Sequence, residues 1–173
     1  MDIDSICSGL KVSAEKLAQQ TAAQKNRALE AVTAYIDEDR DTLLAANARD
    51  VEKARAGGMT EALIERLSLD DKKINDILDS MRIVINQEDP VGEEIAGWTT
   101  PAGMQIRQVR VPLGIVAIIY ESRPNVTVDA FCLAYKSGNA ILLRGSSSAL
   151  ESNKALVKTI KRGLQAAGSS GVP

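Results

Sequence analysis

The chain has 173 residues, of which 45% are apolar and 25% charged, and its formal net charge is −2. This composition is typical of a globular domain with its own core, and the charge gives no electrostatic reason to expect nucleic acid or an anionic membrane as a partner. No stretch approaches the roughly 18 consecutive apolar residues of a membrane-spanning helix.

The sequence contains no histidine and only two cysteines, Cys7 and Cys132. The lack of histidine excludes a Ser-His-Asp triad, a Cys-His pair and a histidine-ligated metal within this chain, and we expect no metal site. Two cysteines do not suggest a disulfide framework, and the acidic start MDIDSICSGL lacks the features of a secretory signal. We therefore expect a cytoplasmic protein, in which both cysteines are reduced.

The segment 1–92 is predicted to be helical. VSAEKLAQQ at 12–20 is amphipathic, and TAAQ at 21–24 has the form of a capping box, in which two side chains satisfy free backbone donors. Apolar residues then keep close to helical spacing, and the charged cluster at 37–41 is the expected break between two helices. AGG at 56–58 ends the second, TEALIERL at 60–67 predicts a short helix, and SLDD at 68–71 opens another.

The segment 93–111 is predicted to form an antiparallel hairpin. EIAGWTT and MQIRQVRV flank TPAG, in which proline and glycine occupy favoured positions of a type I turn. A change of phase in the second strand predicts a bulge near Arg107–Gln108. Trp98 is expected to pack within the hairpin or to make an oligomer contact.

The segment 112–173 is predicted to contain a βαβ unit and a final helix. The apolar runs at 115–120 and 140–143 are typical of strands buried on both faces of a parallel sheet, and the helix expected at 127–136 is the crossover between them. SALE at 148–151 has the form of another capping box. Neither the glycine-rich dinucleotide fingerprint nor a P-loop is present.

Polar loops follow both strands, at 121–125 and 144–147, so they are expected to meet at the carboxyl edge of the sheet, where open α/β sheets bind ligands. The residue types alone leave the roles open. Asn125 could be a turn residue and Arg144 a solvated charge. Arg123 could bind an anionic substrate or pair with Glu121.

The blocks YESRPNVTVDA and KSGNAILLRG resemble the γ-glutamyl phosphate reductase family, the glutamate-5-semialdehyde dehydrogenases, a branch of the aldehyde dehydrogenase superfamily. The resemblance covers essentially the whole chain. It implies an α/β fold with a helical amino-terminal segment, a partial Rossmann-like parallel sheet and an antiparallel hairpin. Members are more than twice as long, so the chain is expected to be an amino-terminal portion, with the cysteine-bearing catalytic domain absent.

The family reduces γ-glutamyl phosphate with NADPH to glutamate 5-semialdehyde and phosphate in proline biosynthesis, through a cysteine nucleophile and an oxyanion held by fixed donors. By position, the resemblance implies that the side-chain amide of Asn125 donates to the oxyanion. It also implies that Arg144 and Ser146 bind the adenosine ribose of the cofactor. It also places Ser147 where NAD-preferring relatives often carry a glutamate. Arg123 is the candidate for binding the anionic substrate.

The resemblance also implies a homo-oligomer that assembles through the hairpin, and glutamate 5-kinase as a partner. The alternative is a truncated, non-catalytic module for nucleotide binding or subunit assembly. Because neither Cys7 nor Cys132 matches the family nucleophile, the isolated chain is expected to be inactive, and Cys132 is expected to pack in the core.

Overall fold

The structure is a computed structural model that describes residues 3–169. The α-helices are α1 (Ile3–Ala18), α2 (Ala22–Glu38), α3 (Arg40–Ala56), α4 (Glu61–Leu67), α5 (Asp71–Asn86), α6 (Pro124–Lys136) and α7 (Leu150–Ala166). The other elements are the strands β1 (Glu94–Thr99), β2 (Gln105–Val109), β3 (Ile115–Ile119) and β4 (Ala140–Arg144), and a 3₁₀ turn, η1 (Ser147–Ala149). Within these described residues, no helix combines the length and the apolar character needed to cross a membrane.

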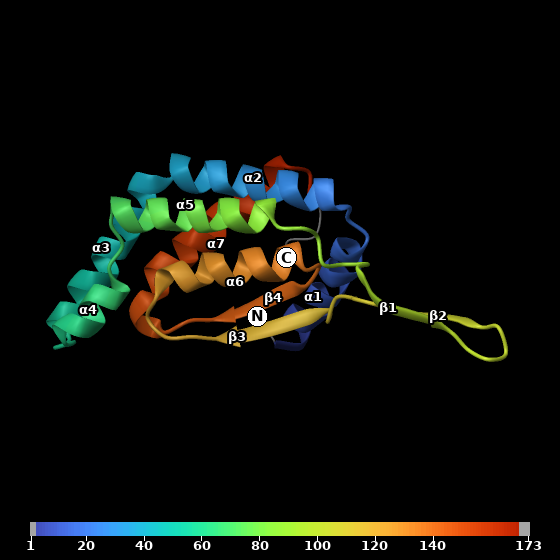
Figure 1. Ribbon diagram of the computed structural model, residues 1–173. Helices are drawn as coiled ribbons and strands as arrows, with labels where there is room; N and C mark the ends of the chain where they lie inside the picture. The colour runs from blue at the N-terminus through green and yellow to red at the C-terminus, as the bar shows by residue number, and fades with distance from the viewer. Residues whose placement is uncertain (1–2, 170–173) are drawn as a thin grey trace.

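The elements form stacked layers, with a hairpin that leaves the body of the molecule (Figure 1). In that view α2 and α5 lie at the top, α6 and α7 lie beneath them, and the β3–β4 sheet lies below. Helix α1 packs against β4, with Leu10 and Ala14 on Ala140. The predicted α/β class, with helical segment, parallel sheet and hairpin, is confirmed.

The main core joins helices that are far apart in the sequence. Its buried apolar side chains come from α1, α2, α3, α5, α6 and α7. The close approach of α2 and α7 requires Gly163, because a Cβ there would lie 2.6 Å from Val32 Cα. Any side chain at this position would push the two helices apart.

Most helix boundaries follow from local signals that the sequence shows. The capping box of α2 is present, with the Thr21 hydroxyl accepting from the Gln24 backbone and the Gln24 side chain accepting from the Thr21 backbone. The predicted break falls at Asp39, and α3 ends at Ala56 before the glycine pair. The crossover helix begins earlier than predicted, because Pro124 takes a first-turn position, where its missing N–H costs nothing.

The capping box predicted at 148–151 is wrong. Residues Ser147–Ala149 form η1 instead, and the residue preceding α7 makes no side-chain cap. The buried carboxylate of Asp50 on α3 accepts the backbone N–H groups of Glu151 and Ser152 at 3.2 and 2.8 Å. The free backbone N–H groups in the first turn of α7 therefore find their hydrogen-bond acceptor on another helix, α3.

The hairpin is a separate two-stranded antiparallel sheet, as predicted. Gly103 N–H donates to the Thr100 carbonyl at 2.9 Å and closes the turn. The bulge lies on the other strand from the one predicted, since the register shifts between Glu94 and Ala96.

Strands β3 and β4 are parallel, as predicted, and pair from Ile115↔Ala140 to Ile119↔Arg144. Their burial is less than predicted, since β3 has no fully buried residue and Ile119 is 84% exposed. Within residues 3–169 the sheet has only these two strands, so part of its surface faces solvent.

Candidate functional site

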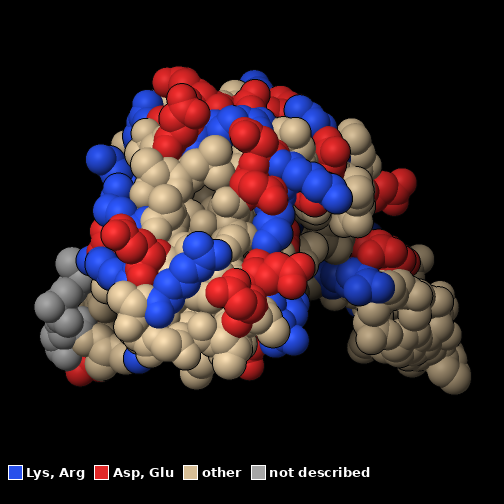
Figure 2. Space-filling view, turned by 90° about the vertical axis from the view of Figure 1, so that its left-hand side faces the viewer, with Lys and Arg blue, Asp and Glu red and all other residues tan. Residues whose placement is uncertain are grey.

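The loops that follow β3 and β4 meet, as the sequence predicted, at the carboxyl edge of the sheet. The hydroxyl of Ser122, in the first loop, lies 2.6 Å from that of Ser148, which follows the second strand. Ser148 is also 2.8 Å from the Ser146 hydroxyl, which accepts its backbone N–H. This end of the molecule faces the viewer in Figure 2, where charges of both signs surround a hollowed area of other residues.

A pocket of about 490 Å³ opens between α4, α5 and the start of α6. Arg123, Pro124 and Asn125 bring the first polar loop into its wall. The opposite wall comes from α4 and α5, including Arg66, Lys73, Asp76, Ile77 and Ser80.

Asn125 lies in the first turn of α6, where its side chain is half-buried in the pocket wall. Its Nδ2 donates to Asp129 Oδ2 at 3.1 Å, one turn along the same helix. An amide nitrogen carries two hydrogens, so one remains for a ligand. Burial raises the pKa of Asp129, and the hydrogen bond from Asn125 only partly offsets this effect.

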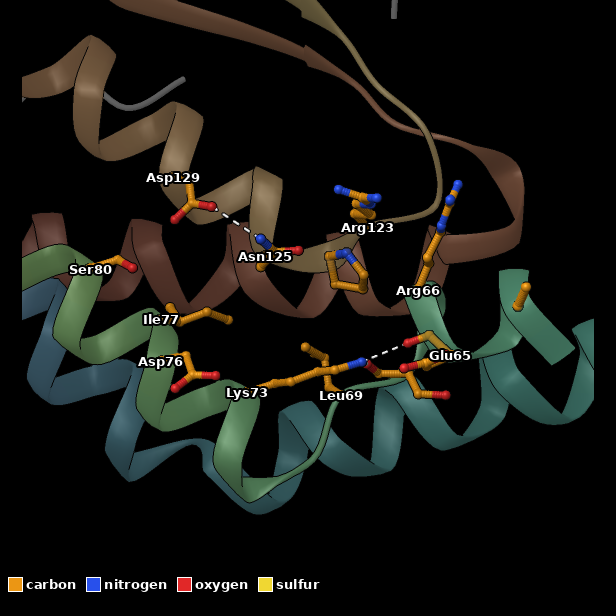
Figure 3. A pocket seen from close by; sticks show the side chains of 13 residues that line it. Glu65, Arg66, Leu69, Lys73, Asp76, Ile77, Ser80, Arg123, Asn125 and Asp129 are labelled. Atoms are coloured by element: carbon orange, nitrogen blue, oxygen red, sulfur yellow. Dashed lines mark hydrogen bonds between the residues drawn. The ribbon is translucent and has the colours of Figure 1, made fainter.

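The charged side chains in this pocket are separated rather than paired (Figure 3). In that view Asp129, Asp76 and Ser80 lie toward one end, and Arg123 and Arg66 lie toward the other. Lys73 is held at the floor, where Nζ donates to the carbonyls of Glu65 and Ser68 at 2.6 and 2.7 Å. The pocket therefore has one end with the carboxylates of Asp76 and Asp129 and an opposite end with two arginines and the exposed carboxylate of Glu65, and Asn125 lies between them.

Arg123 does not pair with Glu121 in the described part of the chain, where every ion pair involves other residues. Its side chain is exposed and lines the pocket instead. Of the two roles left open by the sequence, pairing with Glu121 is not observed within residues 3–169, and binding of an anionic substrate by Arg123 stays a prediction.

The predicted cofactor residues lie at the end of β4, where Arg144 is the last residue of the strand, and in the segment that follows it, outside this pocket. Arg144 is exposed, and its Nη1 donates to the Gly145 carbonyl at 3.0 Å. A guanidinium has five N–H donors, so most of them remain for a ligand such as a phosphate. Ser147 is exposed beside it, whereas the Ser146 hydroxyl is already bonded to Ser148.

Neither cysteine lines the pocket at this edge. Cys132 is 2% exposed within the main core, as predicted. Burial, and then the nearby charge of Asp129, raise the pKa of its thiol to about 12. Within residues 3–169 no group of three or more potential metal ligands is found.

A second pocket, of about 650 Å³, lies between α1, β4 and α7. Its lining is mainly apolar and includes Leu10, Phe131 and Leu164. None of the predicted site residues lines it.

The fold is that of part of an aldehyde dehydrogenase. A probable aldehyde dehydrogenase from Listeria monocytogenes EGD-e superimposes with a TM-score of 0.69 at 15% identity, over 96% of this chain and 34% of that one. The γ-glutamyl phosphate reductase of Thermotoga maritima superimposes with a TM-score of 0.89 at 46% identity, over 92% of this chain and 38% of that one.

The sequence is 48% identical over 156 residues to the γ-glutamyl phosphate reductase of Geobacillus kaustophilus, which covers 90% of this chain. No protein-family model matches the chain. The resemblance carried by the two sequence blocks is thus confirmed, and the chain is a homologue of the γ-glutamyl phosphate reductases. It spans about 38% of the length of the curated relatives it matches.

Sequence reasoning found Arg123 and Asn125 but missed the rest of the pocket. Asp129 had a local signal, since it stands four residues after Asn125 on the same helix face. The residues of α4 and α5 had none, because packing of distant helices brings them to the pocket.

Proposed function

We propose that the chain forms the acyl-phosphate- and nucleotide-binding part of a γ-glutamyl phosphate reductase. This enzyme reduces γ-glutamyl phosphate with NADPH to glutamate 5-semialdehyde and phosphate in proline biosynthesis. The observation that carries the proposal is the pocket at the carboxyl edge of the sheet, in a chain homologous to these reductases. This pocket combines an amide donor with two arginines that form no ion pair within residues 3–169.

In the proposed reaction the acyl carbonyl of the substrate lies against Asn125. Attack by a thiolate on the acyl carbon puts negative charge on the carbonyl oxygen, and the free N–H of Asn125 Nδ2 stabilises that charge. The buried, high-pKa thiol of Cys132 is unsuited to this attack. We therefore place the nucleophile in the part of the relatives that this chain does not span.

Arg123 binds the phosphate end of the substrate in this proposal. The guanidinium offers planar, paired donors that match phosphate oxygens, and no carboxylate in residues 3–169 forms an ion pair with it. The same arginine would stabilise the phosphate as it leaves.

Arg144 and Ser147 would hold the adenosine end of NADPH, which supplies the hydride when bound. The exposed guanidinium fits a 2′-phosphate, and the small hydroxyl of Ser147 leaves room beside it. The Ser146 hydroxyl, bonded to Ser148, would fix the shape of this loop and approach the ribose.

The exposed hairpin favours a second role in subunit assembly. Four large apolar side chains on it are between 44% and 63% exposed: Ile95, Trp98, Met104 and Val109. Both strands also have an unpaired edge, which can pair with another chain. The hairpin would then join copies of the enzyme, and glutamate 5-kinase would supply the acyl phosphate.

The proposal is tested with a hybrid enzyme in which this chain replaces the matching segment of the Thermotoga maritima relative. The assay is phosphate-dependent reduction of NADP⁺ in the presence of glutamate 5-semialdehyde. The unmodified relative is the positive control. A folded hybrid with full cofactor binding and no turnover would show that the chain does not serve this reaction.

A further inference from the structure

The pocket that holds Asn125 contains charges of both signs that do not neutralise one another. Asp129 and Asp76 face it from α6 and α5, and neither forms an ion pair within residues 3–169. Lys73 lies one turn before Asp76 on the same helix, where it could pair with it. It donates instead to two backbone carbonyls, those of Glu65 and Ser68.

The desolvated carboxylate is Asp129. It is half-buried, and within residues 3–169 the one side-chain hydrogen bond that it accepts comes from the neutral amide of Asn125. Removing a carboxylate from water without a cation is unfavourable, and the raised pKa of Asp129 agrees with this. A cationic ligand group would supply the missing charge.

The order of the groups along the pocket matches the order of the groups along the substrate. Figure 3 shows Asp129 and Asp76 at one end, Asn125 in the middle, and Arg123 and Arg66 at the other end, where the exposed Glu65 also lies. γ-Glutamyl phosphate carries an α-ammonium group and an α-carboxylate on the same carbon at one end, an acyl carbonyl within the chain and a phosphate at the other end. With the carbonyl at Asn125 and the phosphate at Arg123, the ammonium end points toward the carboxylates.

We infer that Asp129, assisted by Asp76, recognises the free α-ammonium group of the substrate. This inference rests on the proposed function and adds the residues that recognise the amino group of the substrate. The pocket selects acyl phosphates of amino acids with a free amino group and discriminates against N-acylated ones. An N-acyl group removes the positive charge and leaves the half-buried carboxylate of Asp129 with the neutral amide of Asn125 and no cation beside it.

The experiment measures binding of two stable probes to the 173-residue chain by titration of its backbone amide NMR signals. The first is L-2-amino-6-phosphonohexanoate, which places an amino group and a phosphonate at the spacing of the substrate. The second is its N-acetyl derivative, which keeps the phosphonate and lacks the positive charge. We expect the free amine to bind about tenfold more tightly or better.

Asp129→Asn should abolish that preference while binding of the N-acetyl probe changes little. The asparagine keeps the size of the side chain and an oxygen that accepts from Asn125. Asp79→Asn is the matched control, since Asp79 lies on α5, pairs with Arg82 and is not part of the pocket wall. This control should keep the wild-type preference, and Asp76→Asn should reduce it partially.

Equal binding of the two probes to the wild-type chain would overturn the inference, as would a preference that survives Asp129→Asn in a folded variant. Failure of the chain to bind either probe would also reject it. None of these results decides the proposed function, which is judged by turnover of the hybrid enzyme. A hybrid that is active on glutamate 5-semialdehyde and equally active on its N-acetyl derivative would support the function and reject the ammonium site.

Discussion

The carboxylate of Asp50 accepts both the backbone N–H and the hydroxyl of Ser152, at 2.8 and 2.7 Å, although 102 residues separate them. Asp50 is on α3 and is 3% exposed, and Ser152 lies in the first turn of α7. A negative charge at a helix N-terminus is favourable because it faces free N–H donors and the positive end of the helix dipole. The contact therefore fixes the position of the start of α7, and of the loop before it, relative to α3.

Asp50→Ala is expected to lower the free energy of unfolding by about 2–4 kcal/mol, because it leaves buried donors of α7 without partners. Urea denaturation followed by circular dichroism measures the change. Glu52→Ala, on an exposed position of the same helix, should change stability by less than about 0.5 kcal/mol. Similar effects of the two substitutions would show that the cap is unimportant.

Local sequence signals predicted most helices and strands correctly. Where the prediction of a capping box failed, a contact between residues far apart in the sequence was the cause. The capping box at Thr21 formed because both partners lie within one turn. The one expected at Ser148 did not, because Asp50 satisfies that helix start and the Ser148 hydroxyl bonds to Ser122 and Ser146.

The candidate site was predictable to the same extent. Because parallel strands end at the same edge of a sheet, the sequence predicted that the loops after β3 and β4 would meet there, and the hydroxyls of Ser122 and Ser148 do lie in contact. The end of the pocket that holds Asp76 and Asp129 was not predictable. These two residues are 53 positions apart in the sequence, and only the packing of α5 on α6 brings them to the same pocket.

Cys132 is expected to be unreactive in the folded chain. Its thiol is buried, and a pKa of about 12 leaves almost no thiolate at neutral pH. In Cys7→Ser, a thiol-specific reagent should label Cys132 only after denaturant is added. Fast labelling of the native variant, or reductase turnover of the isolated chain that disappears in Cys132→Ala, would contradict this expectation.

The hairpin is expected to mediate self-association of the chain. Trp98 and Met104 are 52% and 63% exposed on it, and burying such side chains against a second copy removes apolar surface from water. Light scattering after size exclusion should show a smaller species for Trp98→Glu. Ile83→Glu, at a 63% exposed apolar position on α5, is the control and should leave the mass unchanged. A wild-type chain that stays monomeric at all concentrations would reject the assembly role.

Asn125→Ala in the hybrid enzyme is expected to lower kcat by on the order of 10²–10³, because one donor to the developing oxyanion is lost. The Kd for the cofactor should stay nearly constant, since Arg144 and Ser147 lie outside the pocket of Asn125. Steady-state kinetics and cofactor titration separate the two effects. Asn75→Ala, an exposed asparagine on α5 outside the pocket, is the control. A loss confined to cofactor binding would argue against the oxyanion role.

Arg144 and Ser147 are expected to set the preference of the hybrid enzyme for NADPH over NADH. Both side chains are exposed, Arg144 as the last residue of β4 and Ser147 as the first of η1, and Arg144 has donors left for a 2′-phosphate. A charge-assisted contact of this kind contributes about 1.5–3 kcal/mol, which corresponds to a preference of roughly ten- to a hundredfold. Arg144→Ala should weaken NADPH binding much more than NADH binding, and Ser147→Glu should do the same by repulsion.

Lys154→Ala removes an exposed positive charge from α7 and controls for general electrostatic attraction. Fluorescence titration with both cofactors gives the ratio of dissociation constants for each variant. Equal losses for NADPH and NADH in both loop variants would show that this loop does not read the 2′-phosphate.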